Sequence, residues 1–193
     1  MIKTTAMLLE ELSEYANPRS KIFRMSEKKE IFPIVKGLYE TNANTPGYLL
    51  AGSIYGPSYI SFDYALSYHG IIPEAVYIIT NATFEKKKKK EYNTLFGTFT
   101  YRDVPSEAFP LGISLIKEGD YFYRIAVPEK ALCDKLYTIS PVANIKELLK
   151  LLFEDLRIEE SYIEGLDKNL VNLLSSKYNS TNINKLSSLM RRY

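Results

Sequence analysis

The segment Tyr59-Ile-Ser-Phe-Asp-Tyr-Ala-Leu-Ser-Tyr-His-Gly-Ile-Ile-Pro-Glu74 contains both a start signal and a stop signal for one short helix. Ser61 is a favourable N-cap residue, and Asp63 falls in the first turn, where a carboxylate interacts well with the positive end of the helix dipole. Gly70 can adopt the left-handed conformation that ends a helix, and Pro73 blocks its continuation. The segment therefore predicts a strand, a helix and a turn in succession.

The apolar residues of this segment recur at the spacing of one helical face, which comprises Phe62, Ala65, Leu66 and His69. His69 is the one histidine of the chain, so neither a histidine-rich metal site nor a catalytic pair of histidines can form. We expect its side chain to be partly buried and hydrogen-bonded, and not to act as a general base or a ligand.

The overall composition is that of a soluble globular protein, with 193 residues of which 46% are hydrophobic and 25% charged. No apolar run approaches the roughly 20 residues that span a bilayer, and Glu10 and Glu11 interrupt the one N-terminal run that resembles a signal peptide. The single cysteine, Cys133, excludes an internal disulfide and favours a reducing compartment. We therefore expect a cytoplasmic protein that has no membrane partner, and a structural role for Cys133.

Basic residues are concentrated in two places, although the net charge is only +2. Between residues 17 and 36, six basic residues face two acidic ones, and these candidates for DNA binding are Arg19, Lys21, Arg24, Lys28, Lys29 and Lys36. The second concentration is a run of five lysines between Glu85 and Glu91, namely Lys86, Lys87, Lys88, Lys89 and Lys90. This run is either a solvated loop or a patch that binds an anion, because adjacent cations repel one another unless water or an anion screens them.

The N-terminal residues predict a helix from Thr4 or Thr5 to Tyr15, and a second helix that begins at Asn17-Pro18 with Asn17 as the N-cap. Residues 31–39 predict a short hairpin. This order is that of a winged helix-turn-helix from which one of the usual three helices is missing. Since residues 42–47 are the best candidate for a linker, we expect an abbreviated winged region at 1–47 and a second domain at 48–193.

The second domain is expected to be α+β, with a small β-sheet followed by a helical C-terminal half. The predicted strands are residues 76–80 and 94–103 and a hairpin formed by 112–117 and 121–127. The predicted helices are residues 128–137, 144–155, 166–178 and 182–192. In the first of these, Lys130 and Asp134 have the spacing of an i,i+4 ion pair, which we interpret as a surface pair beside Glu129 in the first turn.

Three motifs occur in the order seen in the AbiEi family, the antitoxins and transcriptional regulators of the type IV (AbiE) abortive-infection toxin–antitoxin systems. They are Ser61 followed by Ala65-Leu-Ser-Tyr-His-Gly70, the stretch from Thr94 to Tyr101-Arg102, and the stretch from Ala126 to Asp134. Lys36-Gly-Leu-Tyr39 also resembles the end of the family's wing. The resemblance covers most of residues 20–140.

This resemblance implies an N-terminal winged helix that binds the operon's own promoter DNA and represses it. It also implies a C-terminal domain that neutralises a cognate nucleotidyltransferase toxin without needing a stable complex, and it implies no cofactor. The 47 residues before the second domain are fewer than a full winged domain usually takes. An antitoxin or interaction module that has lost DNA binding is therefore the alternative.

An enzymatic alternative rests on Gly52-Ser53 followed by Asp63, because nucleotidyltransferases combine a Gly-Ser turn with two carboxylates that hold metal ions. Here Ala65 stands where the second carboxylate should be. One carboxylate is not enough to hold two metal ions, so we predict no catalytic residue, no metal site and no enzymatic activity.

Overall fold

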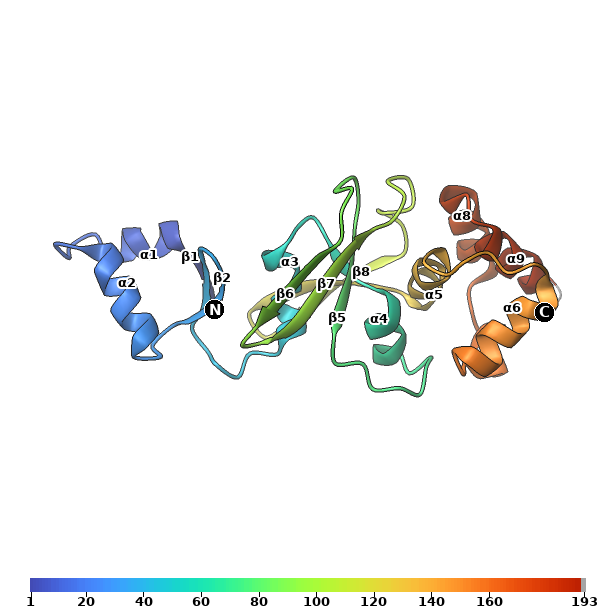
Figure 1. The fold of residues 1–193 in the computed structure, drawn as a ribbon, viewed down its shortest axis with the longest axis horizontal. Helices are drawn as coiled ribbons and strands as arrows, with labels where there is room; N and C mark the ends of the chain where they lie inside the picture. Colours follow the sequence, from blue (N-terminus) through green and yellow to red (C-terminus); the bar gives the residue numbers. More distant parts are fainter. Residues whose placement is uncertain (192–193) are drawn as a thin grey trace.

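The computed structural model describes residues 1–191 and has an α+β fold, as expected. The elements follow one another along the long axis of the molecule (Figure 1). A small N-terminal lobe lies at one end, a six-stranded sheet occupies the centre, and the C-terminal helices gather at the other end. Every helix in this described part of the chain is too short or too polar to cross a lipid bilayer.

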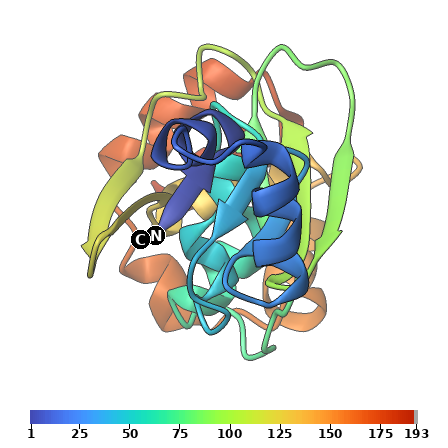
Figure 2. The same cartoon turned by 90° about the vertical axis from the view of Figure 1, so that its left-hand side faces the viewer.

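The N-terminal lobe contains two helices and a three-stranded antiparallel sheet of order β1-β3-β2. Its elements are β1 (Ile2–Thr4), α1 (Thr5–Glu11), α2 (Pro18–Glu27), β2 (Phe32–Val35) and β3 (Leu38–Glu40). Thr4 caps α1 and Asn17 caps α2, each by accepting a backbone N–H, at 3.2 and 3.0 Å respectively. The second helix and the hairpin are as predicted, whereas α1 ends at Glu11, before the expected Tyr15, and β1 was not expected. Figure 2 shows the lobe end-on.

The buried side chains of the lobe form their own small cluster of Leu8, Ile22 and Ile31. Ile34 of β2 instead belongs to the large hydrophobic core of the rest of the molecule. The lobe is therefore attached to the centre through its sheet, in addition to the connection at residues 42–47.

The central sheet has the mixed order β6-β7-β5-β4-β9-β8. Its strands are β4 (Tyr59–Ile60), β5 (Ile79–Thr83), β6 (Lys90–Thr94), β7 (Gly97–Asp103), β8 (Ile113–Glu118) and β9 (Tyr121–Ala126). The β5–β7 and β4–β9 pairs are parallel and the others are antiparallel. The predicted hairpin of residues 112–127 is confirmed as β8 and β9.

Two predicted strands are present, but with different bounds. The strand expected at residues 76–80 begins only at Ile79, because the β5–β7 register pairs Ile79 with Phe99, and Tyr77 is 87% exposed. The strand expected at residues 94–103 is in fact the end of β6, a turn and β7. Leu95 and Phe96, the two apolar residues of the turn, made the whole stretch resemble one strand. Gly97, however, has a φ of +121°, which allows the chain to reverse direction there.

The segment 59–74 forms β4 and then α4 (Phe62–Tyr68). Phe62, Ala65 and Leu66 are buried as predicted, and Gly70 has a φ of +70° at the end of the helix. His69 is partly buried and its Nε2 lies 2.7 Å from the carbonyl oxygen of Ala126, which confirms the expected hydrogen-bonded core histidine.

Helices lie on both faces of the central sheet. A 3₁₀ turn, η1 (Gly47–Leu49), and the short α3 (Ala51–Ile54) lie on the face to which Tyr101 points, because the Tyr101 hydroxyl donates to the Ala51 carbonyl at 2.7 Å. The next residue, Arg102, points to the opposite face and lies over the ring of Phe62 in α4. Neighbouring residues of β7 thus contact opposite layers.

The C-terminal part consists of α5 (Pro128–Tyr137), α6 (Ile145–Lys150), the π-helical turn η2 (Leu151–Asp155), α7 (Glu160–Glu164), α8 (Lys168–Tyr178) and α9 (Thr181–Met190). The helix predicted at residues 128–137 is confirmed as α5, the other three predicted helices are present with shifted ends, and α7 was not expected. Residue 192, to which the last helix was expected to extend, lies outside the described residues, as does 193.

Candidate anion-binding surfaces

The first predicted basic group lies on α2 and its surroundings. Lys21, Arg24 and Lys28 are spaced three and four residues apart, so they form one stripe along the helix. Arg24 and Lys28 are exposed, and the Lys21 ammonium lies 5.1 Å from the centre of the Tyr15 ring. Arg19 is exposed on a neighbouring face of the helix.

Lys29 and Lys36 lie outside the helix. Lys29 follows its C-cap with a φ of +57°, and Lys36 is exposed in the turn between β2 and β3. Phe23 is 66% exposed and follows Arg19 by one helical turn. An exposed aromatic residue among basic residues is suited to contact a partner, and sequence reasoning missed it.

The lysine run does not form one continuous patch. The Lys86 ammonium donates to the Gly56 carbonyl at 3.2 Å and lies over the Tyr55 ring, so this side chain is occupied elsewhere. The Lys87 backbone N–H donates to Oδ2 of Asp103 at 2.6 Å. Oδ1 of Asp103 accepts from the Thr83 hydroxyl at 2.7 Å. Asp103 therefore anchors the loop at Lys87, and the side chain of Lys86 is directed away from the lysines that follow.

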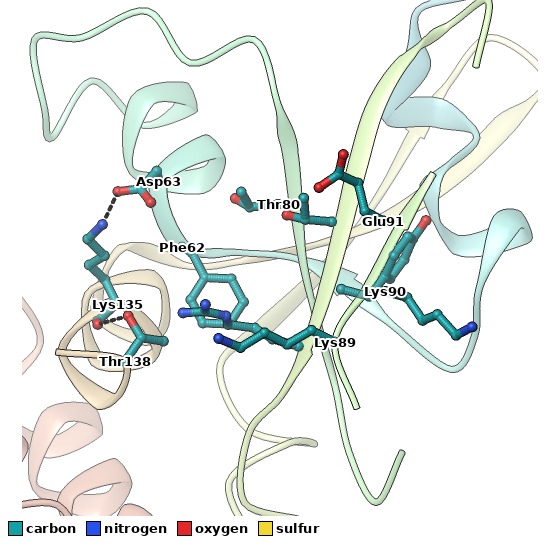
Figure 3. A pocket seen from close by; sticks show the side chains of 11 residues that line it. Phe62, Asp63, Thr80, Lys89, Lys90, Glu91, Lys135 and Thr138 are labelled. Carbon is teal, nitrogen blue, oxygen red and sulfur yellow. Dashed lines mark hydrogen bonds and ion pairs between the residues drawn. The ribbon is translucent and has the colours of Figure 1, made fainter. Parts of the chain in front are cut away.

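The remaining lysines border a cleft between the α4–α5 layer and the β6–β7 hairpin (Figure 3). The cleft exists because α4 packs on β5, and α5 on α4 and β9, whereas β6 and β7 extend beyond them. One hollow of about 390 Å³ is lined by Phe62, Asp63, Thr80, Lys89, Lys90, Glu91, Thr100, Tyr101, Arg102, Lys135 and Thr138. A second, of about 520 Å³, is lined by Lys87, Lys88, Lys89, Arg102, Asp103, Tyr137 and Thr138.

Positive charge dominates the two hollows, which together are lined by six cationic side chains and three carboxylates. Asp63 is paired with Lys135 at 2.6 Å across the α4–α5 boundary. Arg102 lies 5.8 Å from the centre of the Phe62 ring, and Lys89 extends toward the same ring, whereas Lys90 extends in the opposite direction (Figure 3). Within residues 1–191, neither Lys89 nor Arg102 forms an ion pair.

The floor of the cleft has an unusual backbone. Phe62 is 3% exposed and has a φ of +55°, a conformation that is rare for a bulky side chain. Strained residues of this kind persist where the surrounding packing holds them and are common at functional sites. Arg102 and Lys135 were not among the predicted site residues. The alternation of β7, which sends Arg102 to the α4 face, is the signal that could have identified Arg102.

A buried polar network lies behind the cleft. Lys130 and Asp134 form the expected ion pair at 3.3 Å, but both side chains are fully buried, so the expectation of a surface pair was wrong. Asp134 accepts hydrogen bonds from Ser61, Tyr59 and Tyr178, and Lys130 donates to Tyr178 and to the Ala108 carbonyl. These partners arrive from β4, α8 and a loop, which spacing along α5 cannot reveal.

The electrostatics of this network follow from its burial. Burial lowers the pKa of Lys130, an effect that Asp134 partly offsets. Burial and the neighbouring carboxylate raise the pKa of the Tyr59 and Tyr178 hydroxyls well above the usual value. Cys133 is buried, and burial raises the pKa of its thiol, so it has the environment of a structural residue.

The residues of the enzymatic alternative are not brought together. Gly52 and Ser53 are in α3 and line a hollow with Pro57, while Asp63 lines the cleft and is paired with Lys135. Glu129 accepts the backbone N–H of Asp167 at 2.8 Å. No group of three His, Cys, Asp or Glu residues within the described chain is arranged to hold a metal ion.

No protein-family model matches the sequence, and no curated protein matches it.

Proposed function

We propose that this chain is a non-enzymatic antitoxin of the AbiEi type that also represses its own promoter. The antitoxin half rests on the three ordered motifs that begin at Ser61, Thr94 and Ala126. The DNA-binding half rests on the basic stripe of α2, and the order of helix, basic helix and hairpin supports it.

The stripe of Lys21, Arg24 and Lys28 is the single observation that carries DNA binding. A helix with exposed cations on one side can enter the major groove, where it contacts phosphates and base edges. Lys36, in the β2–β3 turn, would contact the backbone as a wing does, and β1 supports that hairpin as a third strand. Binding is expected to be salt-dependent because each phosphate contact releases counterions.

Fluorescence anisotropy with the duplex upstream of the gene tests this half. We expect the duplex to bind more tightly than a shuffled one at physiological salt. The variant Arg24→Gln/Lys28→Gln should lower the slope of log K against log salt by about one for each phosphate that is no longer neutralised. Lys150→Gln, an exposed lysine on α6, is the matched control. Equal affinity for both duplexes would reject the repressor.

Co-expression with the nucleotidyltransferase encoded by the neighbouring gene tests the antitoxin half. We expect this chain to restore growth, and failure to do so would reject it as that toxin's antitoxin. Metal-dependent nucleotide turnover that disappears in Asp63→Ala would instead support an enzyme.

An antitoxin or interaction module without DNA binding is the second candidate. The observation that favours it is that the three motifs that begin at Ser61, Thr94 and Ala126 all lie outside the N-terminal lobe. It predicts that the wild-type chain shows no promoter preference, while Arg24→Gln/Lys28→Gln still restores growth against the toxin.

A further inference from the structure

We propose that the cleft between the α4–α5 layer and the β6–β7 hairpin binds an oligophosphate, either a free phosphate chain or the polyphosphate group of a nucleotide. This site lies in the central part of the molecule and does not involve the basic stripe of α2. It is therefore independent of DNA binding by the N-terminal lobe.

The charge of the cleft is the first argument. All three of its carboxylates already have partners: Asp63 is paired with Lys135, Asp103 accepts hydrogen bonds from Thr83 and the Lys87 backbone, and Glu91 accepts one from the Asn93 side chain. Folding also brings Arg102 next to the lysine run, since Lys89 and Arg102 line both hollows. Like charges so close repel one another, and a bound anion would remove this cost.

The shape of the cleft is the second argument. The hollows of about 390 and 520 Å³ have Lys89, Arg102 and Thr138 in common and are therefore adjoining parts of one trough. This size is that of small-molecule sites. Because the cations are distributed along the trough, several linked phosphoryl groups would neutralise them better than one orthophosphate. A concave site of this kind suits a small anion better than the convex backbone of a duplex.

The position of Arg102 is the third argument. Its guanidinium lies over the ring of Phe62, whose strained backbone is held in the floor of the cleft. An arginine that is fixed on an aromatic ring loses little freedom on binding, and its planar donors match two phosphate oxygens at once. Lys89 extends toward the same ring and supplies a second cation (Figure 3).

Isothermal titration calorimetry of the full chain at constant ionic strength tests the proposal. We expect sodium tripolyphosphate to bind saturably and at least about tenfold more tightly than orthophosphate. ATP is the second probe. If ATP binds more tightly than tripolyphosphate, the ligand is a nucleotide. If the two bind equally, the phosphate chain alone is recognised. Both results support the site.

Variants locate the site in the cleft. Lys89→Gln and Arg102→Lys, the second of which keeps the charge and loses the planar fork, should each weaken tripolyphosphate binding about tenfold. Lys150→Gln should leave it unchanged, and thermal melting checks that each variant is folded. The proposal is overturned if tripolyphosphate shows no saturable binding, or if orthophosphate binds with equal affinity. It is also overturned if Lys89→Gln and Lys150→Gln lose the same affinity for tripolyphosphate, or if duplex DNA displaces tripolyphosphate.

Discussion

The hydroxyl of Ser61 donates to Oδ2 of Asp134 at 2.6 Å, so the N-cap residue of α4 is hydrogen-bonded to the middle of α5. Ser61 does occupy the N-cap position, but its side chain caps no backbone N–H of α4. The hydroxyl instead joins the strand–helix junction to the buried network of Lys130, Asp134 and Tyr178. This bond links α4 to α5, the two helices that form one wall of the cleft, in addition to the Asp63–Lys135 ion pair.

Ser61→Ala is therefore expected to lower the free energy of unfolding by about 1.5–3 kcal/mol, the range for a hydrogen bond to a charged group. Urea unfolding followed by circular dichroism measures this. Ser58→Ala is the matched control, because the buried Ser58 hydroxyl has no hydrogen-bond partner among the described residues. We expect its removal to be nearly neutral.

Asp134→Asn in the Ser61→Ala background completes a double-mutant cycle. We expect the two losses to be clearly less than additive, because Ser61→Ala removes the hydrogen bond whose charged acceptor Asp134→Asn removes. Full additivity, or a Ser61→Ala effect no larger than that of Ser58→Ala, would contradict this role of Ser61.

Gly112→Ala is expected to destabilise the chain more than Gly119→Ala. Both glycines have a left-handed φ, +65° and +57° respectively, so both substitutions carry the backbone cost, about 1 kcal/mol. A Cβ at residue 112 would come within 2.9 Å of Cβ of the buried Lys130, whereas a Cβ at residue 119 would meet nothing within 4 Å. The two midpoints of urea unfolding compare the variants, and equal midpoints would show that the site near Lys130 relaxes freely.

The sequence was sufficient to predict those elements whose signals are local. The helix after Ser61, the capped helix at Asn17-Pro18 and the partly buried His69 follow from neighbouring residues, and all three are confirmed. The burial of Lys130 and Asp134 does not, because a spacing of four residues is the same on an exposed and on a buried helical face. The buried position depends on distant residues such as Tyr178, which lies 44 residues beyond Asp134 and donates a hydrogen bond to it.

The cleft was predictable only in part for the same reason. The lysine run was visible as a candidate anion-binding patch, but its division depends on Asp103, which is 16 residues from Lys87 in sequence. Arg102 and Lys135 enter the cleft from a strand and a helix whose relative placement is a property of the folded sheet. Sequence reasoning thus found the charge and missed its arrangement.

Tyrosine burial is expected to make the chain unfold in alkali. Burial raises the pKa of the Tyr101 hydroxyl, whereas an unfolded tyrosine ionises near pH 10. Above about pH 10 the unfolded state therefore binds fewer protons than the folded state. Stability then falls by about 1.4 kcal/mol per pH unit for each such tyrosine. Lys130 has the opposite effect at lower pH. Because its pKa is lowered in the folded state, the folded chain loses this proton before the unfolded chain does, and stability rises with pH. The rise ends when the unfolded lysine also loses its proton, near pH 10.4.

Tyr101→Phe tests this expectation. The variant loses the hydrogen bond to the Ala51 carbonyl, which costs about 1 kcal/mol at neutral pH, yet its stability should fall less steeply above pH 10. Urea unfolding at a series of pH values, with tyrosinate absorbance as a second probe, measures both effects. Parallel stability curves for the variant and the wild type above pH 10 would contradict the role assigned to Tyr101.

Asp103→Ala is expected to release the lysine loop while leaving the sheet intact. Its carboxylate accepts the Lys87 N–H and the Thr83 hydroxyl, and a hydrogen bond to a charged acceptor contributes about 1.5–3 kcal/mol. Losing it should increase the population of the open loop, so trypsin should cleave after the lysines at least about tenfold faster. Asp120→Ala, an exposed aspartate in the β8–β9 turn, is the control. An unchanged rate of cleavage in Asp103→Ala would contradict this role of Asp103. The loop would then be held by the contacts of Lys86 with Tyr55 and Gly56, and Lys86→Ala would release it instead.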